Sequence, residues 1–330
     1  MVNNFMSDWA ISSQLIIDEA EKMGIKNRIL SKKNNFFLLE KEGKKVYFKS
    51  VDCGLNSAFG LKISNNKELT YIFAESNDIR VPKSIYIDRE NYNSINLENL
   101  DIDFPVISKP VNGAHGDGVS LDLNNFEDLK RGLDFSFQDK SVYRVVVQEQ
   151  IEGEDHRIIV LNGKVEAVTK RIPPYVKGDG NSSIKELIDK ENNNPLRGIG
   201  GDHDAPMSNI KVDSELEKYL EAQGYSMDYV LEKDKEIFVR QNANLSSGGL
   251  ALDLTDIIHP EVKKQAEKIA TLAGLGFCGV DFFCKDISMG IKKGGGAIIE
   301  INATPGIRMH HFPSKGKSRN LAKKIIEAIF

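Results

Sequence analysis

The sequence has few cysteines, no long apolar run and no excess of charge of either sign. Its 330 residues include three cysteines, Cys53, Cys278 and Cys284, whose spacing is not that of metal ligands. An odd, scattered set excludes a disulfide framework and a zinc ribbon, so we expect buried or incidental thiols. No stretch approaches the roughly 18 apolar residues of a membrane span, and the N-terminus lacks the pattern of a signal peptide. We therefore expect a cytoplasmic protein with no membrane partner.

The near-neutral charge excludes two further classes. Lys and Arg number 44 against 48 Asp and Glu, a formal charge of -4, and 40% of the residues are hydrophobic. A nucleic-acid-binding protein carries a basic excess and a disordered chain has few apolar residues, so neither is expected. At roughly 150 residues per domain, the length predicts two domains or one large α/β unit built from several lobes.

Familiar catalytic motifs are also absent. Gly316-Lys317-Ser318 ends like a phosphate-binding P-loop, but His311 stands where the first glycine of that motif belongs. There is no Gly-x-Ser-x-Gly elbow, no His-Glu-x-x-His and no cysteine pair at redox spacing. The function must therefore rest on other side chains.

Apolar periodicity and turn residues predict a chain of alternating elements. The first part contains a helix over 9–23 closed by Gly24, three short strands with a hairpin at Glu42-Gly43, a helix over 66–76 and a polar surface connection over 88–103. Strands follow over 104–109, 119–123 and 142–150, with an antiparallel pair around Asn162-Gly163. Residues 173–211 predict a functional loop around one helix over 184–191. The remaining elements are predicted over 236–241, 260–273, 277–284, 297–301 and 318–329.

A glycine-rich hairpin tip is the first candidate site. The strand over 104–109 runs through Pro110 into a tip that contains Gly113, Gly116 and Gly118. Glycines let backbone N–H groups approach a polyphosphate with no side chain in the way. Lys109 precedes this tip inside a buried strand, where a lysine is rare unless it pairs with an anion. The alternative is a plain flexible hairpin.

Acidic side chains inside apolar strands form the second candidate site. Glu300 and Asn302 point to the same face because side chains alternate along a strand, and a neighbouring strand can bring Asp281 beside them. Three oxygen ligands on one sheet face suit Mg²⁺, which takes further ligands from water and phosphates. The alternative is a set of solvated edge residues.

Taken together, these features resemble the ATP-grasp superfamily, and the amino-acid sequences of the motifs are similar to those in the ATP-grasp module of cyanophycin synthetases. The segments that carry the match are 153–157 (Gly-Glu-Asp-His-Arg), 173–198 with Pro195-Leu196-Arg197-Gly198, 244–249 (Asn-Leu-Ser-Ser-Gly-Gly) and 300–310 (Glu-Ile-Asn-Ala-Thr-Pro-Gly-Ile-Arg-Met-His). The match covers about residues 10–330, and the module of bifunctional glutathione synthetases is the next most similar.

The resemblance implies an α+β / α/β fold of the ATP-grasp type, in which two α+β lobes clamp ATP behind a short N-terminal α/β lead-in. The implied divisions are a lead-in over 1–66, a flap lobe over 67–152 and a metal- and substrate-binding lobe over 153–330.

The resemblance also implies roles for individual residues. Catalytic roles fall to Arg308, Lys109 and Arg171. The residues implied to bind ATP are Lys67, Lys109, Gly113, Gly116, Gly118, Glu149, Gln150, Ile151, Asp155 and Lys170, with Glu149, Gln150 and Ile151 at the adenine. Those implied to face the substrate are Ser246, Ser247, Gly248, Gly249 and Arg308. Asp281, Glu300 and Asn302 would hold Mg²⁺, as two ions that Mn²⁺ can replace. For His156 and His310, structural and catalytic roles stay open.

The implied activity is ATP-dependent joining of a carboxylate to an amine through an acyl phosphate, with an amino acid or short peptide as substrate. Cyanophycin synthetases carry a second ligase domain with a P-loop, and the chain shows no such motif, so we expect a single step. Two alternatives are a glutathione-synthetase-like ligase that joins γ-glutamylcysteine to glycine, and a nucleotide-binding protein without catalysis. The partners are small-molecule acids and amines, with no nucleic acid and no membrane, and a homo-oligomer is left open.

Overall fold

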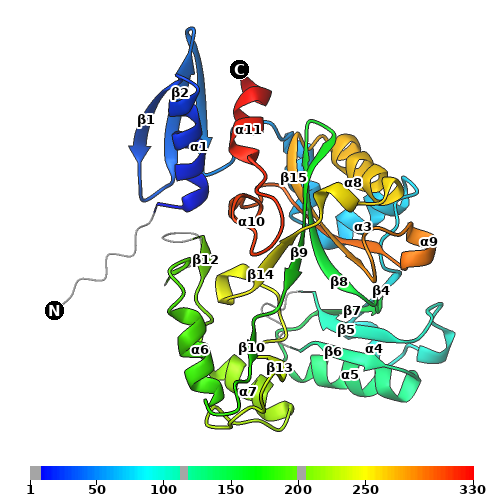
Figure 1. Ribbon diagram of the computed structural model, residues 1–330. Helices are drawn as coiled ribbons and strands as arrows, with labels where there is room; N and C mark the ends of the chain where they lie inside the picture. Colours follow the sequence, from blue (N-terminus) through cyan, green and yellow to red (C-terminus); the bar gives the residue numbers. More distant parts are fainter. Residues whose placement is uncertain (1–8, 112–117, 199–205) are drawn as a thin grey trace.

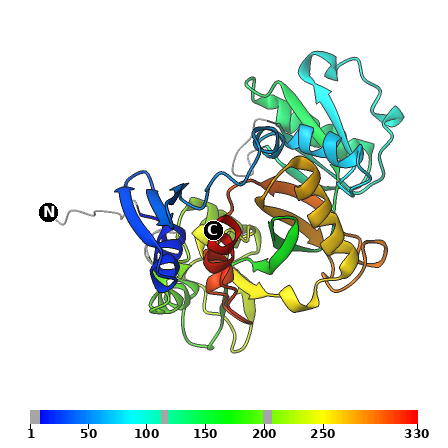
Figure 2. The same ribbon diagram turned by 90° about the horizontal axis from the view of Figure 1, so that it is seen from above.

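Three main sheets make up the fold of the computed structural model, which describes residues 9–111, 118–198 and 206–330 (Figure 1). Their strand orders are β1-β2-β3, β4-β7-β5-β6 and β14-β9-β8-β15-β16. Two small pairs, β10-β13 and β11-β12, complete the strands. Seen from above, the β1–β3 unit and the β4–β7 lobe lie on opposite sides of the molecule (Figure 2). In the described ranges, no helix is both long enough and apolar enough to cross a membrane.

The N-terminal unit is one helix on a three-stranded antiparallel sheet. Its elements are α1 (Ile11–Lys22), β1 (Lys26–Ser31), β2 (Phe36–Lys41) and β3 (Lys44–Lys49). Glu42 and Gly43 both adopt positive φ angles, 51° and 84°, as a two-residue hairpin of the predicted kind requires. Phe37 and Phe48 from the sheet share a buried core with Ile325 from α11 (Leu321–Ile329), so the two ends of the described chain pack together.

The second sheet is covered on one face by α5. The lobe contains β4 (Ser84–Asp88), β5 (Val106–Pro110), β6 (Ser120–Leu123), β7 (Arg144–Glu149), α5 (Phe126–Gln138), α4 (Arg89–Tyr92) and a 3₁₀ turn η1 (Leu97–Asn99). Val145 and Val147 join the core beneath α5, so the alternate residues of β7 face the other way. β5 and β6 pair antiparallel, as the hairpin prediction requires. Asn125 caps α5, an element that the sequence analysis missed.

The five-stranded sheet forms the centre of the molecule. It consists of β8 (Glu154–Leu161), β9 (Lys164–Ile172), β14 (Leu250–Asp253), β15 (Phe277–Cys284) and β16 (Ala297–Asn302). Packed around it are α2 (Ala58–Ser64), α3 (Lys67–Glu75) and α8 (Pro260–Ala273), with short elements η2 (Leu245–Ser247), η3 (Thr255–Ile257), α9 (Ile291–Gly294) and α10 (Arg308–His311). Tyr71 and Ala74 of α3 share a core with residues of α8 and β15. The predicted bounds of α8 and β15 are the observed ones.

Residues 173–211 are more ordered than the predicted loop. They contribute β10 (Tyr175–Lys177), α6 (Ile184–Asn192), β11 (Arg197–Gly198) and β12 (Met207–Ser208). With α7 (Ser214–Ala222) and β13 (Glu236–Phe238), they enclose their own small core, which includes Ile184, Leu220 and Val176. The helix predicted over 184–191 is confirmed as α6, whereas the short strands were not predicted, and β10 has its partner β13 beyond residue 211. Residues 199–205 lie outside the described ranges.

Candidate active site

Lys109 lies on the face of β5 that points away from α5. Its Nζ donates to Oε1 of Gln148 at 2.8 Å, and Nε2 of Gln148 donates to Oγ of Ser84 at 2.8 Å. The three residues come from adjacent strands β5, β7 and β4, which explains the alignment. Burial lowers the pKa of Lys109 to about 8, and the positive charge of Lys67 acts in the same direction. Lys109 and Gln148 line a cavity of about 360 Å³.

Lys67 forms the second cationic group at this cavity. It is the first residue of α3, whose preceding Asn66 caps the helix by accepting from the N–H of Leu69. Nζ of Lys67 lies 3.0 Å from Oε2 of Glu300 on β16. Both side chains stay partly exposed, at 44% and 39%. The structure therefore brings Lys67, Lys109 and Glu300, which are far apart in the sequence, to one place.

Asp281 and Glu300 stand directly opposite each other on β15 and β16, as strand alternation predicts. Asn302 lies two residues beyond Glu300 and opposite Gly279. The same row continues across the sheet through Arg157 on β8, Thr169 on β9 and Asp253 on β14. One end of this sheet face is therefore polar from edge to edge.

The Asp281 carboxylate is held by two arginines. Arg157 forms a two-pronged ion pair with Asp281 and both side chains are 10% exposed, while Arg171 donates to Oδ2 of Asp281 at 3.0 Å. Arg171 also contacts Asp155 at 2.7 Å. Burial alone would lower the pKa of Arg171, but the two carboxylates raise it above its ordinary value. Burial raises the pKa of the Asp155 carboxyl, and Arg171 opposes that rise.

The donor set of Asp281, Glu300 and Asn302 fits Mg²⁺ in its chemistry, since all three side chains offer oxygen. Nδ2 of Asn302 is buried and makes no hydrogen bond to the described protein, so this donor stays available to an acceptor such as a phosphate oxygen. Across the described ranges, no three His, Cys, Asp or Glu side chains gather as a metal-binding group, and the predicted trio depends on the Asn302 amide as its third ligand. Its metal-binding role stays a prediction.

The residues expected at the adenine lie where β7 leaves the second sheet. The Glu149 carboxylate pairs with Arg80 and accepts from the N–H of Lys83 at 3.1 Å. Oε1 of Gln150 accepts from the N–H of Asp122 at 2.9 Å, and Ile151 follows at partial burial. The Glu149 side chain is thus already engaged within the protein. Any contact to adenine from this segment would come more readily from its backbone.

Two further residues predicted to bind ATP, Lys170 and Gly118, contact other parts of the protein. Lys170 pairs with Glu154, and Gly118 adopts a φ of 71° with its hypothetical Cβ 2.7 Å from Pro110. A side chain at position 118 would collide with Pro110, so packing alone explains this glycine. Gly113 and Gly116 lie outside the described residues.

The predicted substrate-facing residues lie around β12. Arg308 is 2% exposed and donates from Nη2 to Oγ of Ser208 at 3.1 Å. Ser246 and Ser247 belong to η2, which ends at Gly248 with a φ of 102°. A Cβ on Gly248 would lie 2.6 Å from Cα of Ile210, and Gly249 is equally confined by Ala243. Close packing against Ile210 therefore requires Gly248, and close packing against Ala243 requires Gly249.

Three residues at these sites were missed, although two of them lay inside recognised motifs. Arg157 ends the 153–157 segment and Arg197 stands in the 195–198 segment. Gln148 lies in β7 beside Lys109. These residues could have been found by the pattern that identified Lys109, which is a cationic or amide side chain within a buried strand.

His156, His310, Cys278 and Cys284 are buried. Nδ1 of His310 lies 2.7 Å from Oγ1 of Thr169, and burial lowers the pKa of His310 to about 3. Nδ1 of His156 lies 2.9 Å from the carbonyl oxygen of Glu154, and burial lowers its pKa as well. Both imidazoles are therefore neutral near pH 7. Cys53, Cys278 and Cys284 are free thiols, as predicted, with Cys53 only partly buried.

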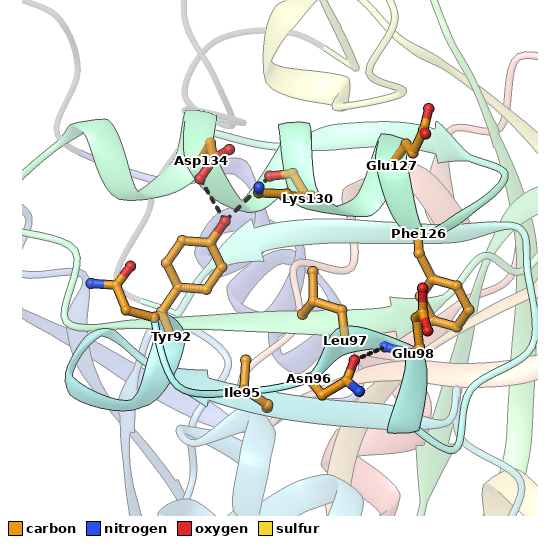
Figure 3. Close-up of a pocket in the computed structure, with 10 residues that line it drawn as sticks. Tyr92, Ile95, Asn96, Leu97, Glu98, Phe126, Glu127, Lys130 and Asp134 are labelled. Carbon is orange, nitrogen blue, oxygen red and sulfur yellow. Dashed lines mark hydrogen bonds between the residues drawn. The ribbon is translucent and has the colours of Figure 1, made fainter.

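Another cavity, shown in Figure 3, lies on the opposite side of the second sheet. It is formed by the segment around Tyr92 and Leu97 and by Phe126 and Asp134 of α5. The Tyr92 hydroxyl donates to Oδ1 of Asp134 at 2.5 Å across it. None of the predicted site residues lines this cavity, and α5 with its core separates it from Lys109.

Known proteins resemble both the sequence and the structure. A sequence model described as a RimK-like ATP-grasp domain matches residues 64–182, and one described as an ATP-grasp-like domain matches residues 7–52. Cyanophycin synthetase of Synechocystis sp. is 36% identical over 97% of this chain and 36% of its own length. The glutathione biosynthesis bifunctional protein GshAB of Clostridium perfringens is 32% identical over 98% of this chain and 41% of its own length.

Among solved structures, a bifunctional glutathione synthetase from Pasteurella multocida has a TM-score of 0.77 and 28% identity. The match covers 99% of this chain and 45% of that one. The chain thus spans less than half the length of these relatives. The matches extend over nearly all of the chain and agree with its mixed α and β architecture. The chain belongs to the ATP-grasp superfamily.

Proposed function

We propose that the chain is an ATP-dependent ligase that joins a carboxylate to an amine through an acyl phosphate. Its substrate would be an amino acid or a short peptide. The relatives named as cyanophycin synthetase and glutathione synthetase support this activity class. The observation that carries the proposal is that Lys67 and Lys109 line one cavity and that Lys67 pairs with Glu300, which stands opposite Asp281.

The chemistry required of the protein is electrostatic. When the carboxylate attacks the γ-phosphate, negative charge spreads over the transferring group, and positioned cations stabilise it. Lys109 and Lys67 supply that charge from two directions. The loss of the Lys67 contact to Glu300 on nucleotide binding would free both side chains.

Proteins of this family use ATP and divalent metal ions, and here Asp281, Glu300 and Asn302 would hold them. A bound Mg²⁺ would neutralise phosphate charge and orient the γ-phosphate. We propose two ions, with Mn²⁺ as a substitute. Arg157 and Arg171 hold the Asp281 carboxylate in position. They occupy some of the lone pairs on its two oxygens, so only the remaining lone pairs can bind a metal ion.

An ADP-release assay tests the proposal. Wild-type protein is screened with ATP, Mg²⁺ and a panel of carboxylic acids, with hydroxylamine as a general nucleophile. Mass spectrometry then identifies products with amino-acid acceptors. Lys109→Ala and Glu300→Ala are expected to abolish acid-dependent ADP release.

Matched controls are Lys62→Ala and Glu98→Ala, which remove exposed residues of the same types away from the cavity. An undiminished rate in Lys109→Ala or Glu300→Ala would contradict the site assignment.

A glutathione-synthetase-like reaction is the second candidate, favoured by the similarity to the Pasteurella multocida enzyme. γ-Glutamylcysteine and glycine alone would then trigger ADP release. ATP binding without turnover across the whole panel would favour the third candidate, a nucleotide-binding protein without catalysis.

We further propose the division of the chain at residues 66 and 152, a cytoplasmic location and small-molecule acid and amine substrates. Limited proteolysis tests the division: cuts near both positions are expected, and cuts confined to other places would oppose it.

A further inference from the structure

A third cavity, of about 470 Å³, lies between residues 194–197 with 206–207 on one side and the segment that follows α10 on the other. Its lining includes Leu196 and Arg197, Leu250 of β14, and Phe312. Leu250 stands opposite Ile172 on β9, one residue beyond Arg171. The cavity therefore begins beside the strand that carries the Arg171 contact to Asp281.

Arg197 is the unusual member of this lining. Its side chain is 2% exposed. Nη1 donates to the carbonyl oxygens of Ser208 at 2.7 Å and Gly248 at 3.1 Å, whereas Nε is buried without a partner in the described protein. Its contact with Glu191 is 3.9 Å, too long for a hydrogen bond. A buried guanidinium whose close contacts are two neutral carbonyls has only this long contact to the half-exposed Glu191 to offset its charge.

Two other buried arginines of the chain have close carboxylate partners. Arg240 is also 2% exposed, but it pairs with Asp213 and with Glu215 at 2.9 Å. Arg157 pairs with Asp281. Compared with these, Arg197 lacks a carboxylate at hydrogen-bonding distance among the described residues, and it lines a cavity large enough to admit one.

The other described residues of the lining offer no competing cation. Burial lowers the pKa of His311 to about 4, so this imidazole is neutral near pH 7. Leu196, Leu250 and Phe312 give an apolar wall. Glu191 is the one acidic side chain among the described residues of the lining and stays half-exposed, so the lining suits a molecule that offers one carboxylate to Arg197 and has an uncharged or apolar remainder.

We propose that this cavity binds the α-carboxylate of an amino-acid or peptide substrate, with Arg197 as its cationic anchor. The inference rests on the proposed ligase function. Gly248, whose carbonyl accepts from Arg197, ends the η2 segment, so the same contact links the anchor to the predicted substrate-facing residues. A guanidinium can hold a carboxylate through two parallel N–H donors, and a C-terminal amide cannot replace that anion.

The test measures binding without ATP, so that it is independent of turnover. The probes are the common amino acids and a set of dipeptides, each with its C-terminal amide as the matched neutral probe, titrated by calorimetry. Wild-type protein is expected to bind at least one carboxylate probe tenfold or more tightly than its amide. Arg197→Leu is expected to lose that preference, and Arg197→Lys to keep only part of it.

Two more variants keep the test sharp. Because Arg197 also holds Ser208 and Gly248, its loss can disturb folding, whereas Leu196→Trp fills the mouth of the cavity from an exposed position and leaves Arg197 in place. Leu196→Trp is expected to weaken carboxylate binding at least tenfold. Lys190→Leu, which removes an exposed charge from α6 outside the cavity, is expected to bind as wild type does.

The outcomes separate the two proposals. Equal binding of carboxylate and amide probes, unchanged preference in Arg197→Leu, or no binding by any probe would overturn the carboxylate site. Absence of acid-dependent ADP release from the wild type would overturn the ligase function, even where the probes bind as expected.

Discussion

Replacing Lys109 with methionine should stabilise the protein while removing its proposed activity. Burial lowers the pKa of Lys109 from its ordinary value of 10.5 to about 8. The fold therefore disfavours the charged form, which is the opposite of what an ion-paired lysine shows. A shift of this size corresponds to a cost of about 3 kcal/mol for keeping Lys109 charged in the folded protein near pH 7.

The dependence on pH follows from proton counting. Between about pH 8 and 10.5 the unfolded chain binds the Lys109 proton and the folded chain does not, so the free energy of unfolding rises with pH in this window. Below pH 8 both states are protonated, and the cost is fully present. Lys109→Met has no such group. Its advantage over wild type should be about 3 kcal/mol at pH 7, less the lost hydrogen bond to Gln148, and should shrink towards pH 10.

Other groups titrate in the same range, so the comparison must be between the two proteins. Burial raises the pKa of the three cysteine thiols to about 12, which lowers stability above pH 9 because only the unfolded thiols ionise there. This effect is common to wild type and variant and cancels in the difference.

The assay is urea unfolding of both proteins at pH 7, 8.5 and 10, with EDTA present to remove divalent ions. A wild-type to variant difference that stays constant with pH would refute the reasoning. So would a variant less stable than wild type at pH 7. ADP release measured on the same preparations should be lost, since the buried cation that lowers the stability of the protein is the one proposed to meet phosphate.

The remaining predictions concern stability and reactivity. Arg157→Leu should lower the free energy of unfolding in urea by about 3 kcal/mol, because Asp281 then keeps only its Arg171 contact; a loss below 1 kcal/mol would mean that the pair contributes little. Gly153→Ala should lower the free energy of unfolding by about 2 kcal/mol or more in the same assay, since φ is 133° and the added Cβ would lie 2.2 Å from the carbonyl carbon of Cys284. The control Gly24→Ala, at φ 70° with no atom near its added Cβ, should lower it by only about 1 kcal/mol. Equal losses in the two variants would contradict this reasoning. The three thiols should react with iodoacetamide far more slowly in the folded protein than in urea, as their raised pKa values suppress the thiolate, whereas a thiol that reacts at the rate of free cysteine would disprove its burial.

Local signals determined which elements could be predicted. α8 begins at Pro260 and is capped at its end by Gly274 in the left-handed region, so a proline and a glycine in the sequence mark its two ends. α5 lacks any glycine or proline at its ends, and it went unrecognised although Asn125 caps it. The small unit around α6 and α7 was missed for a different reason. Its core joins residues on both sides of a turn-rich stretch, and pairing at that distance leaves no local pattern.

In the candidate metal site, too, the sequence predicts what neighbouring residues in the chain determine, but not the contacts between distant strands. Alternation along β16 places Glu300 and Asn302 on one face, and this much is contained in six consecutive residues. Asp281 also contacts Arg157 and Arg171, because β15 lies beside β8 and β8 lies beside β9. No local pattern in the sequence contains this strand order. The consequence is chemical. Two guanidiniums already balance the Asp281 charge, whereas Glu300 has one exchangeable lysine, so a divalent ion would gain more from Glu300 than from Asp281. Glu300→Gln should therefore weaken Mg²⁺-dependent ADP release more than Asp281→Asn, as a titration of activity against Mg²⁺ would measure, and the reverse order would show that the arginines do not compete with the metal.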